Sequence, residues 1–137
     1  MANLIQPHGS EVLKPLFISD AQQHSELSAE AERLTAIAVS SATAGNAVML
    51  GGGYFTPLDG FMTRADALSV GDTMHTSSGL FWPTPVLNLV TDARSVKIGD
   101  RIALKDPNVE DAPVLACLLY TSPSPRDATL SRMPSSA

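Results

Sequence analysis

The spacing of apolar and polar residues predicts a short helix near the start of the chain. Leu27, Ala31 and Leu34 recur at helical intervals and share one face of a helix expected over residues 25–34. Ser25 precedes an acidic first turn and is the expected N-cap. We therefore predict an amphipathic, peripheral helix here.

A second helix is indicated by a cap and a stop. The small-residue segment 42–50 follows Ser40 and Ser41, either of which can cap a helix. Gly51-Gly52-Gly53 should end it, because glycine readily takes the left-handed conformation found after a helix terminus.

The rest of the chain predicts one more helix and then strands. Thr63 can cap a helix over residues 64–70, which is expected to stop at Gly71-Asp72. Short apolar segments bounded by turn residues predict strands at residues 36–39, 80–82, 85–90, 101–104 and 114–116, with a turn at 106–108. Short strands that start at prolines, with helices toward the front, predict an α+β fold built on a small mixed β-barrel.

The composition is that of a globular domain with an acidic excess. Hydrophobic residues make up 44% of the chain, charged residues 17%, and the formal net charge is -5. Lysines and arginines occur singly, so no basic stripe is available to neutralise a phosphate backbone. Nucleic acid is therefore not an expected partner.

The sequence also gives expectations about location. No apolar run approaches the roughly 20 residues that span a bilayer. The first residues lack a charged region followed by an apolar one, as a secretory signal would have. We expect a cytoplasmic protein without membrane contact, and the single cysteine, Cys117, cannot form an internal disulfide.

The character of the sequence changes after Ala116. Residues 117–137 include five serines and three prolines, a composition that by itself favours a disordered linker. However, residues 117–127 are what one reading frame of a transposase-type sequencing adapter encodes, and residues 131–137 match the constant segment beyond the adapter's index. We therefore predict a domain over residues 1–116 and a non-native tail over 117–137, disordered after its first residues.

Two features suggest binding chemistry at first sight. Gly51-Gly52-Gly53 could cradle a phosphate, but such loops normally lie between a strand and a helix, whereas these glycines follow a helix. His8, His24 and His75 show neither the i, i+4 pair nor the Cys/His spacing of a metal site. A helix stop and surface or loop histidines are the favoured interpretations, and no Gly-x-Ser-x-Gly elbow supports a serine nucleophile.

An acid and an aromatic group complete the candidates. Asp59 could be a general base, but an aspartate before glycine in a proline-containing turn more often bonds to nearby backbone. Tyr54, Phe55 and Phe61 could stack on a nucleic-acid base, although without basic neighbours a core cluster is favoured. We therefore assign no catalytic, cofactor-binding or metal-binding residue.

Five segments match the motifs of one enzyme family, in that family's order. They are Pro7-His8-Gly9, residues 41–49, residues 53–62 (Gly-Tyr-Phe-Thr-Pro-Leu-Asp-Gly-Phe-Met), residues 80–86 with Trp82-Pro83-Thr84-Pro85, and the hairpin at 99–107. Together they resemble the amino-terminal domain of the ATP sulfurylase, or sulfate adenylyltransferase, family. The resemblance covers nearly all of residues 4–116, and residues 41–49 are most similar to the branch found in sulfur-oxidising and sulfate-reducing microbes.

The resemblance implies a PUA-like barrel, here incomplete at its carboxyl-terminal end, that packs against a separate catalytic domain. In the family that second domain binds ATP, Mg²⁺ and sulfate, forms adenylyl sulfate and diphosphate reversibly, and carries the motif Gln-x-Arg-Asn-Pro-x-His-x-x-His. Neither Arg-Asn-Pro nor His-x-x-His occurs in the 137 residues. The resemblance therefore implies a fragment that is inactive alone and that belongs to a homo-oligomeric parent enzyme.

An alternative hypothesis is a stand-alone PUA-like binding module, for instance for RNA. Only fold analogy supports it, and the acidic net charge argues against it. A salt-dependent filter-binding titration separates the two, because an RNA-binding module should show affinity at low salt.

Overall fold

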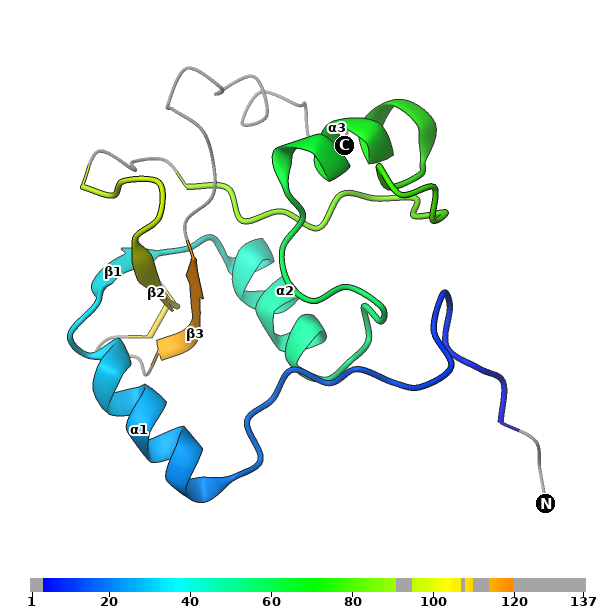
Figure 1. The fold of residues 1–137 in the computed structure, drawn as a ribbon. Helices are drawn as coiled ribbons and strands as arrows, with labels where there is room; N and C mark the ends of the chain where they lie inside the picture. Colours follow the sequence, from blue (N-terminus) through cyan, green and yellow to red (C-terminus); the bar gives the residue numbers. More distant parts are fainter. Residues whose placement is uncertain (1–3, 91–94, 107, 110–113, 120–137) are drawn as a thin grey trace.

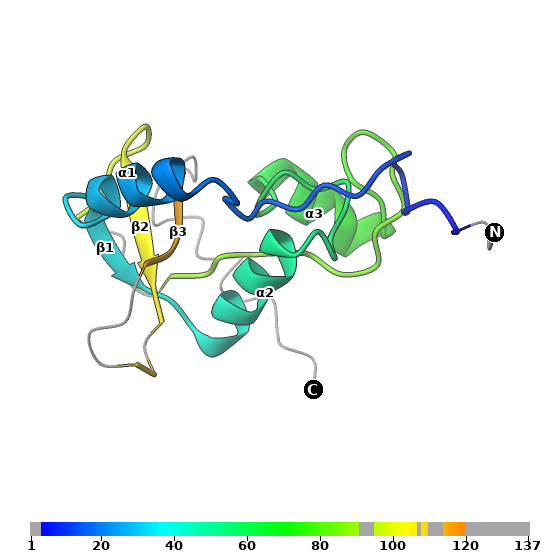
Figure 2. The same ribbon diagram turned by 90° about the horizontal axis from the view of Figure 1, so that it is seen from below.

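The computed structural model describes residues 4–90, 95–106, 108–109 and 114–119, and this part of the chain contains three helices and three short strands (Figure 1). In chain order its elements are α1 (Ala21–Ala31), β1 (Thr35–Ala38), α2 (Ser41–Gly51), α3 (Arg64–Thr73), β2 (Arg101–Lys105) and β3 (Val114–Leu119). Helices α1 and α3 lie at opposite ends of the molecule, and Figure 2 shows the same separation. The predicted α+β class is confirmed.

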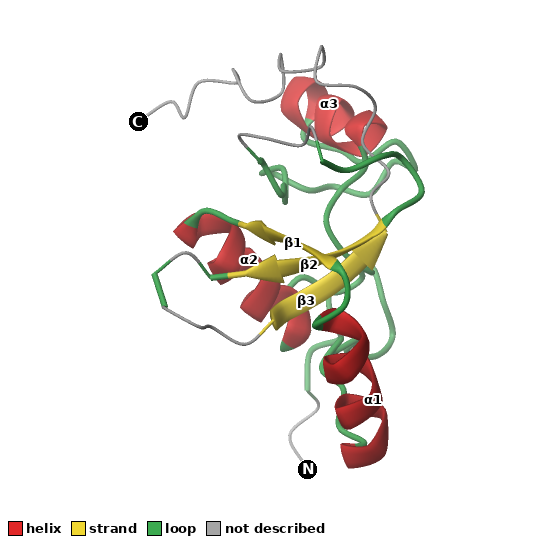
Figure 3. Cartoon of the chain, turned by 90° about the vertical axis from the view of Figure 1, so that its left-hand side faces the viewer, coloured by secondary structure: helices red, strands yellow, loops and turns green. Residues whose placement is uncertain are grey.

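The strands form one mixed sheet in the order β1-β2-β3 (Figure 3). β1 and β2 are parallel, with Ile37 opposite Leu104, whereas β2 and β3 are antiparallel, with a register shift at Leu104/Lys105. Parallel neighbours need a long crossover, and here the connection between β1 and β2 contains both α2 and α3. In the part of the chain that the structure describes, β1 and β3 are the edges of the sheet.

The main core lies around the central strand. Ile102, Ala103 and Leu104 of β2 are almost fully buried, with exposed fractions of 1%, 0% and 0%. Ile102 and Leu104 belong to a cluster whose other buried members are Ile37, Val39, Ala44 and Val96, with Phe61 and Val90 packed against it. A strand that is buried on both faces has a continuously apolar sequence. For this reason β2 could be predicted from the sequence.

The first helix differs from its prediction. α1 begins after Asp20, whose side chain accepts a hydrogen bond from the backbone of Gln23, so Ser25 lies inside the helix and is not its cap. The helix ends at Ala31, before Leu34. The polar start of α1 has no apolar period, so periodicity found only its second half. Its single buried residue, Ala31, confirms that the helix is peripheral.

The second helix follows its prediction closely. Ser40 is the N-cap, and its hydroxyl accepts from the backbone N–H of Thr43 at 3.1 Å. The helix ends in the glycine run, as expected. Gly52 keeps a right-handed conformation, and Gly53 takes the left-handed one with φ of 78°.

The third helix starts as predicted but ends later. Thr63 caps α3, yet the helix continues through Gly71-Asp72 to Thr73, and Met74 takes the left-handed conformation with φ of 56°. A glycine inside a helix costs only about 1 kcal/mol, so Gly71 alone does not stop it. The predicted end was therefore wrong by one turn.

Two of the predicted strands do not form ladders. Residues 80–82 contribute only an isolated bridge between His75 and Phe81, and residues 85–90 form no strand. Prolines at 83 and 85 remove backbone donors, and Val86 instead accepts a hydrogen bond from the N–H of Met62 at 2.9 Å.

The structure describes only part of the segments that were predicted near the carboxyl terminus. In the predicted turn at 106–108, Asn108 N–H donates to the Asp106 carboxylate at 2.8 Å, while residue 107 lies outside the described residues. The predicted strand at 114–116 is observed as β3 and extends to Leu119, past the proposed join at Ala116. Residues 120–137, where the disordered tail was predicted, are also outside the described residues.

Asp66 connects the start of α3 to the loop that follows the helix. One carboxylate oxygen accepts from the N–H of Ser77 at 3.0 Å and from the hydroxyl of Ser77, and the other accepts from the Thr63 hydroxyl at 3.2 Å. The hydrogen bonds from the Ser77 hydroxyl and then its backbone N–H hold the pKa of Asp66 below its ordinary 3.8. The ionised carboxylate therefore stabilises this junction.

We expect Asp66→Asn to reduce the acid sensitivity of the fold. A lowered pKa in the folded state gives stability that is complete above the unfolded value of about 4 and is lost as pH falls through the folded value. Thermal unfolding midpoints measured from about pH 6 down to about pH 2 should therefore converge for the two proteins at the acid end. Asp72→Asn, an exposed position on the same helix, is the control and should keep the original profile. Parallel profiles for Asp66→Asn and the unsubstituted protein would contradict this assignment.

Candidate functional site

A groove of about 860 Å³ lies where three distant parts of the sequence meet. The amino-terminal segment, the end of α2 with the turn after it, and residues 81–86 form its walls. Its lining residues are Pro7, His8, Leu13, Asn46, Gly52, Gly53, Tyr54, Phe55, Thr56, Phe81, Trp82, Pro83, Thr84, Pro85 and Val86. Four of the segments that carry the family resemblance, 7–9, 41–49, 53–62 and 80–86, therefore contribute to one surface, which we treat as the candidate site.

The glycine run brings the amino-terminal segment onto the end of α2, where Figures 1 and 2 show the two passing each other. The Gly51 carbonyl accepts from the N–H groups of Leu16 and Phe17 at 2.9 and 3.1 Å. A Cβ atom at Gly51 would lie 2.4 Å from the Phe17 ring, closer than packed atoms approach. The run ends the helix as predicted, and it also provides the backbone surface on which Phe17 packs.

A second contact fixes the same crossing one turn later. The buried hydroxyl of Thr56 donates to the Gly53 carbonyl at 2.6 Å and accepts from the Lys14 N–H at 3.0 Å. Gly53 itself faces the backbone of Pro15, so that a Cβ would lie 3.0 Å from the Pro15 nitrogen. This side of the groove is therefore held by backbone contacts, which leave the two crossing segments little room to move.

We expect Thr56→Val to destabilise the protein by about 1–3 kcal/mol. Valine keeps the side-chain shape but removes the acceptor of the Lys14 N–H and one of the two donors to the Gly53 carbonyl, which keeps its bond from the Thr56 N–H. A polar group that loses its partner away from water is costly. Urea unfolding measures the change. Thr56→Ser retains the hydroxyl and is the matched control, so an equal loss in both variants would show that the methyl group, and not the hydrogen bonds, is responsible.

Aromatic side chains form another wall. Trp82 contacts the ring of Phe55 edge-on, with centroids 6.1 Å apart, and the ring of His8 at the same separation. His8 Nε2 also donates to the Phe81 carbonyl at 2.7 Å, and His75 packs edge-on against Phe81 at 5.6 Å. His8 and His75, predicted as surface or loop residues, are exposed, and both contact Phe81.

The aromatic residues predicted as one core cluster separate. Tyr54 is 73% exposed at the groove, Phe55 packs on Trp82, and Phe61 packs against the sheet core. The prediction of a shared cluster was wrong, because the chain turns immediately after α2 and sends neighbouring side chains in different directions.

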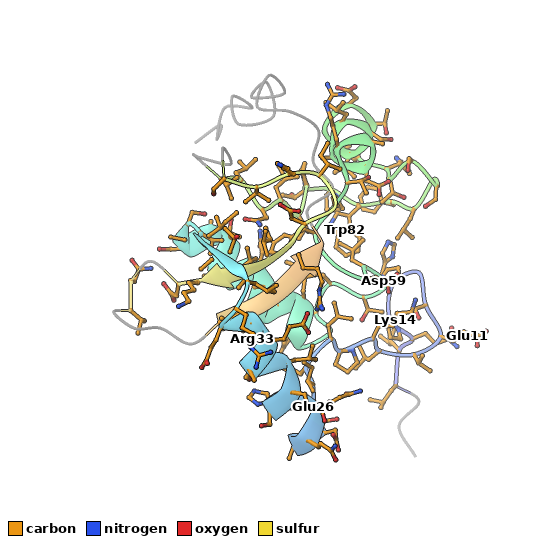
Figure 4. The ribbon with its side chains drawn as sticks, turned by 60° about the vertical axis from the view of Figure 1, so that its left-hand side comes forward. Glu11, Lys14, Glu26, Arg33, Asp59 and Trp82 are labelled. Carbon is orange, nitrogen blue, oxygen red and sulfur yellow. The ribbon has the colours of Figure 1, made fainter. Side chains whose placement is uncertain are left out.

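Asp59 also differs from its favoured interpretation. It is exposed and makes no hydrogen bond to the described part of the chain, so the predicted bond to nearby backbone is not formed. In Figure 4 it lies on the same side of the molecule as Trp82 and Lys14, away from Glu26 and Arg33. It does not line the groove, and no side chain in the described part of the chain forms a hydrogen bond or ion pair with it.

Other candidates stay apart. His24 is exposed on α1 and does not line the groove. Among the described residues, no three histidine, cysteine, aspartate or glutamate side chains come together as a metal site would require. The helices in the same part of the chain are all too short or too polar to cross a bilayer.

Among the described lining residues of the groove, His8 is the single basic side chain. None of its described lining residues is a lysine, arginine, aspartate or glutamate. Sequence reasoning found the motifs at 7–9, 41–49, 53–62 and 80–86 but not their convergence, and it missed Leu13 as a lining residue. Leu13 carries no local signal, because its position at the groove depends on how the chain crosses itself.

The chain is similar to proteins of known class over most of its length. It is 53% identical over 119 residues to a sulfate adenylyltransferase of Allochromatium vinosum, covering 87% of this chain and 30% of that protein. It is 48% identical over 118 residues to a sulfate adenylyltransferase of Alcanivorax borkumensis, covering 86% of this chain and 29% of that protein. The chain therefore spans less than a third of the length of these relatives.

A solved structure gives the same picture. A protein described as a hexameric APS kinase from Thiobacillus denitrificans aligns with a TM-score of 0.74 and 30% identity, covering 87% of this chain and 23% of that one. Residues 5–123 match the family described as PUA-like domains, which confirms the fold that the resemblance implied. This match continues past Ala116, and the boundary placed there stays a prediction. The chain belongs to the family of PUA-like domains.

Proposed function

We propose that this chain is the amino-terminal part of a sulfate adenylyltransferase and does not perform the reaction by itself. The observation that carries this proposal is an identity of 48% to 53% with enzymes of that name, over nearly the whole chain but at most 30% of their length. The parent enzyme would convert ATP and sulfate to adenylyl sulfate and diphosphate, reversibly.

The chemistry of that reaction supports the proposal that this chain does not catalyse it alone. A sulfate oxygen attacks the α-phosphorus of ATP while diphosphate leaves, so two anions must be brought together. Such a step depends on cationic side chains and Mg²⁺ placed around the developing charge. The groove described above has no lysine or arginine among its described lining residues. We infer that the groups that bind ATP, Mg²⁺ and sulfate belong to the rest of the parent enzyme.

The proposal extends to location and assembly. We propose a cytoplasmic enzyme, since its substrates ATP and sulfate are met there, and a homo-oligomeric parent, since the structural neighbour is described as hexameric. A stand-alone RNA-binding module gains no support from the groove, because neutral walls do not provide the electrostatic attraction that phosphate backbones require.

The decisive experiment is to recover the source locus with clean reads beyond the codon for Ala116. The proposal expects an open reading frame that continues for more than twice the length of the matched region and encodes the Arg-Asn-Pro and His-x-x-His motifs. A natural stop codon close to Ala116 would overturn it.

We expect the purified 137-residue chain to release no diphosphate from ATP and sulfate. The reason is that the charged groups needed for the reaction are not gathered in its groove. A coupled diphosphate assay measures this, with the full-length Allochromatium vinosum relative as the positive control. Turnover that rises in proportion to the concentration of the chain would contradict the expectation.

A further inference from the structure

We propose that the pair Asp59–Gly60 is a site of spontaneous covalent modification, at which the aspartate isomerises to isoaspartate through a cyclic succinimide. The inference goes beyond the proposed function and does not depend on it, since it concerns the chemistry of this chain alone. Both residues lie on the loop that leads from α2 to α3 (Figure 4). They form the one Asp-Gly pair in the 137 residues, and no Asn-Gly pair occurs.

The reaction needs only the chain and water. The backbone nitrogen of Gly60 attacks the side-chain carboxyl carbon, Cγ, of Asp59, so that a C–N bond forms while a C–O bond breaks. The amide proton and the carboxyl hydroxyl leave as one molecule of water, and a five-membered succinimide remains. Water then opens the ring at one of its two carbonyls. Opening at Cγ restores aspartate, whereas opening at the backbone carbonyl gives isoaspartate of the same mass, with a free α-carboxyl.

The first argument is that the attacking nitrogen is accessible. A Cβ at Gly60 would meet nothing within 4 Å, so no neighbouring atom crowds this residue. The Gly60 N–H donates to no acceptor in the described part of the chain. A hydrogen-bonded amide must lose that bond before its nitrogen can react, and this cost is absent here.

The second argument is that the reacting carboxyl group is unrestrained. Asp59 is exposed, and no hydrogen bond or ion pair within the described residues holds its side chain. The side chain can therefore sample the rotamers that bring Cγ toward the next backbone nitrogen. Neither residue belongs to a helix or a strand, so no backbone ladder fixes the dihedral angle between the two reacting groups. Nucleophile and carboxyl carbon are thus kept close in one chain and are free to meet.

The other five described aspartates are held in place. Four of them accept a hydrogen bond from a backbone N–H, namely Asp20, Asp66, Asp100 and Asp106. Asp72 lies inside α3, where the N–H of the following residue belongs to the helix. All five also precede residues with larger side chains than glycine. Isomerisation should therefore be selective for the Asp-Gly pair.

The modification would change the length of the main chain between two anchors. Before the pair, the Leu58 N–H donates to the Phe55 carbonyl at 2.8 Å, and after it the Met62 N–H donates to the Val86 carbonyl at 2.9 Å. Isoaspartate adds one main-chain atom between these two hydrogen bonds. Phe61, which packs against the sheet core, lies in the same stretch. We expect the Met62 N–H to exchange with solvent several-fold faster in the isomerised chain.

The test follows the folded 137-residue chain during prolonged incubation in neutral buffer, with tryptic digestion and mass spectrometry at intervals. Trypsin releases residues 34–64, in which Asp59 is the sole acidic residue. Isomerisation should produce a second form of this peptide with the same mass and a different elution time, whereas deamidation of Asn46 would raise the mass. A methyltransferase that esterifies isoaspartyl α-carboxyls with S-adenosylmethionine should label the second form. Residues 1–33, which contain Asp20, are the internal control and should remain one form at their original mass.

Two variants test the assigned chemistry. Gly60→Ala places a methyl group beside the attacking nitrogen, and the open space around Gly60 accommodates it. Asp59→Glu keeps the charge but would have to close a six-membered ring. In both variants the second form should accumulate several-fold more slowly than in the unsubstituted chain. Accumulation at the original rate in both would overturn the proposal.

A synthetic peptide of residues 54–63 gives the rate of the reaction without the fold. Because the fold leaves both reacting groups without partners, the folded chain should isomerise within a few-fold of the peptide rate. A peptide that isomerises while residues 34–64 of the folded chain stay in one form would show that the fold protects the pair, and would overturn the inference. Equal isomerisation in the control residues 1–33 would remove the selectivity and also overturn it.

Discussion

Gly53→Ala is expected to lower the free energy of unfolding by about 2–4 kcal/mol. Gly53 has a φ of 78°, where a residue with a Cβ is strained by about 1–2 kcal/mol. The added carbon would also lie 3.0 Å from the nitrogen and 3.2 Å from the Cα of Pro15. Those are backbone atoms, so relief requires the amino-terminal segment to move away from the groove.

A matched substitution in the same helix region should change stability in the opposite direction. Gly45 lies inside α2, and a Cβ at that position would meet nothing within 4 Å. Gly45→Ala should therefore stabilise the protein by up to about 1 kcal/mol through helix propensity. Denaturant titration of the two variants gives the comparison. A loss below about 1 kcal/mol for Gly53→Ala would mean that the crossing of the two segments is less tightly fixed than the contacts indicate.

The glycine run illustrates what sequence could predict. That glycines end α2 followed from the preceding small-residue helix and from the preference of glycine for left-handed conformations. That Gly51 supports the ring of Phe17, and that Gly53 faces Pro15, did not follow, because each depends on a chain crossing between residues more than thirty positions apart. Local propensity carries no information about such a crossing.

The strands also include one that the sequence predicted correctly and one that it did not. β2 was predicted within one residue, because a strand buried on both faces is continuously apolar. Residues 85–90 have an equally apolar pattern but join no ladder, since backbone pairing depends on whether a neighbouring strand is available as well as on the pattern itself. The start of α1 was missed for another reason: Asp20 is an ordinary N-cap, but the polar turn that follows it has no apolar period.

To predict the candidate site, one needs both the local sequence motifs and the contacts between distant segments of the chain. The motifs at 7–9, 41–49, 53–62 and 80–86 could be recognised individually, and the structure brings parts of all four to one groove. Their residues have structural partners in common: His8 bonds to the Phe81 carbonyl, and Phe55 packs on Trp82. The motifs are therefore linked in the structure, because residues of one help to hold residues of another in position.

Leu104→Ala should have an effect as large as any single change in this domain, about 2–5 kcal/mol of unfolding free energy. Leu104 has an exposed fraction of 0%, lies opposite Ile37 in the parallel pair, and belongs to the cluster that joins the sheet to α2. Truncation removes buried apolar area and leaves a cavity that the surrounding strands can close only in part.

Because domains of this size are stable by only about 5–15 kcal/mol, that loss is a large share of the total. Urea unfolding followed by circular dichroism measures it, and Ile98→Ala is the control, since truncating a 63% exposed side chain should change stability by no more than about 0.5 kcal/mol. A small effect of Leu104→Ala would show that the core lies elsewhere than around β2. A large effect of Leu104→Ala, with Ile98→Ala close to the unsubstituted protein, would show that the packing around β2 stabilises the domain.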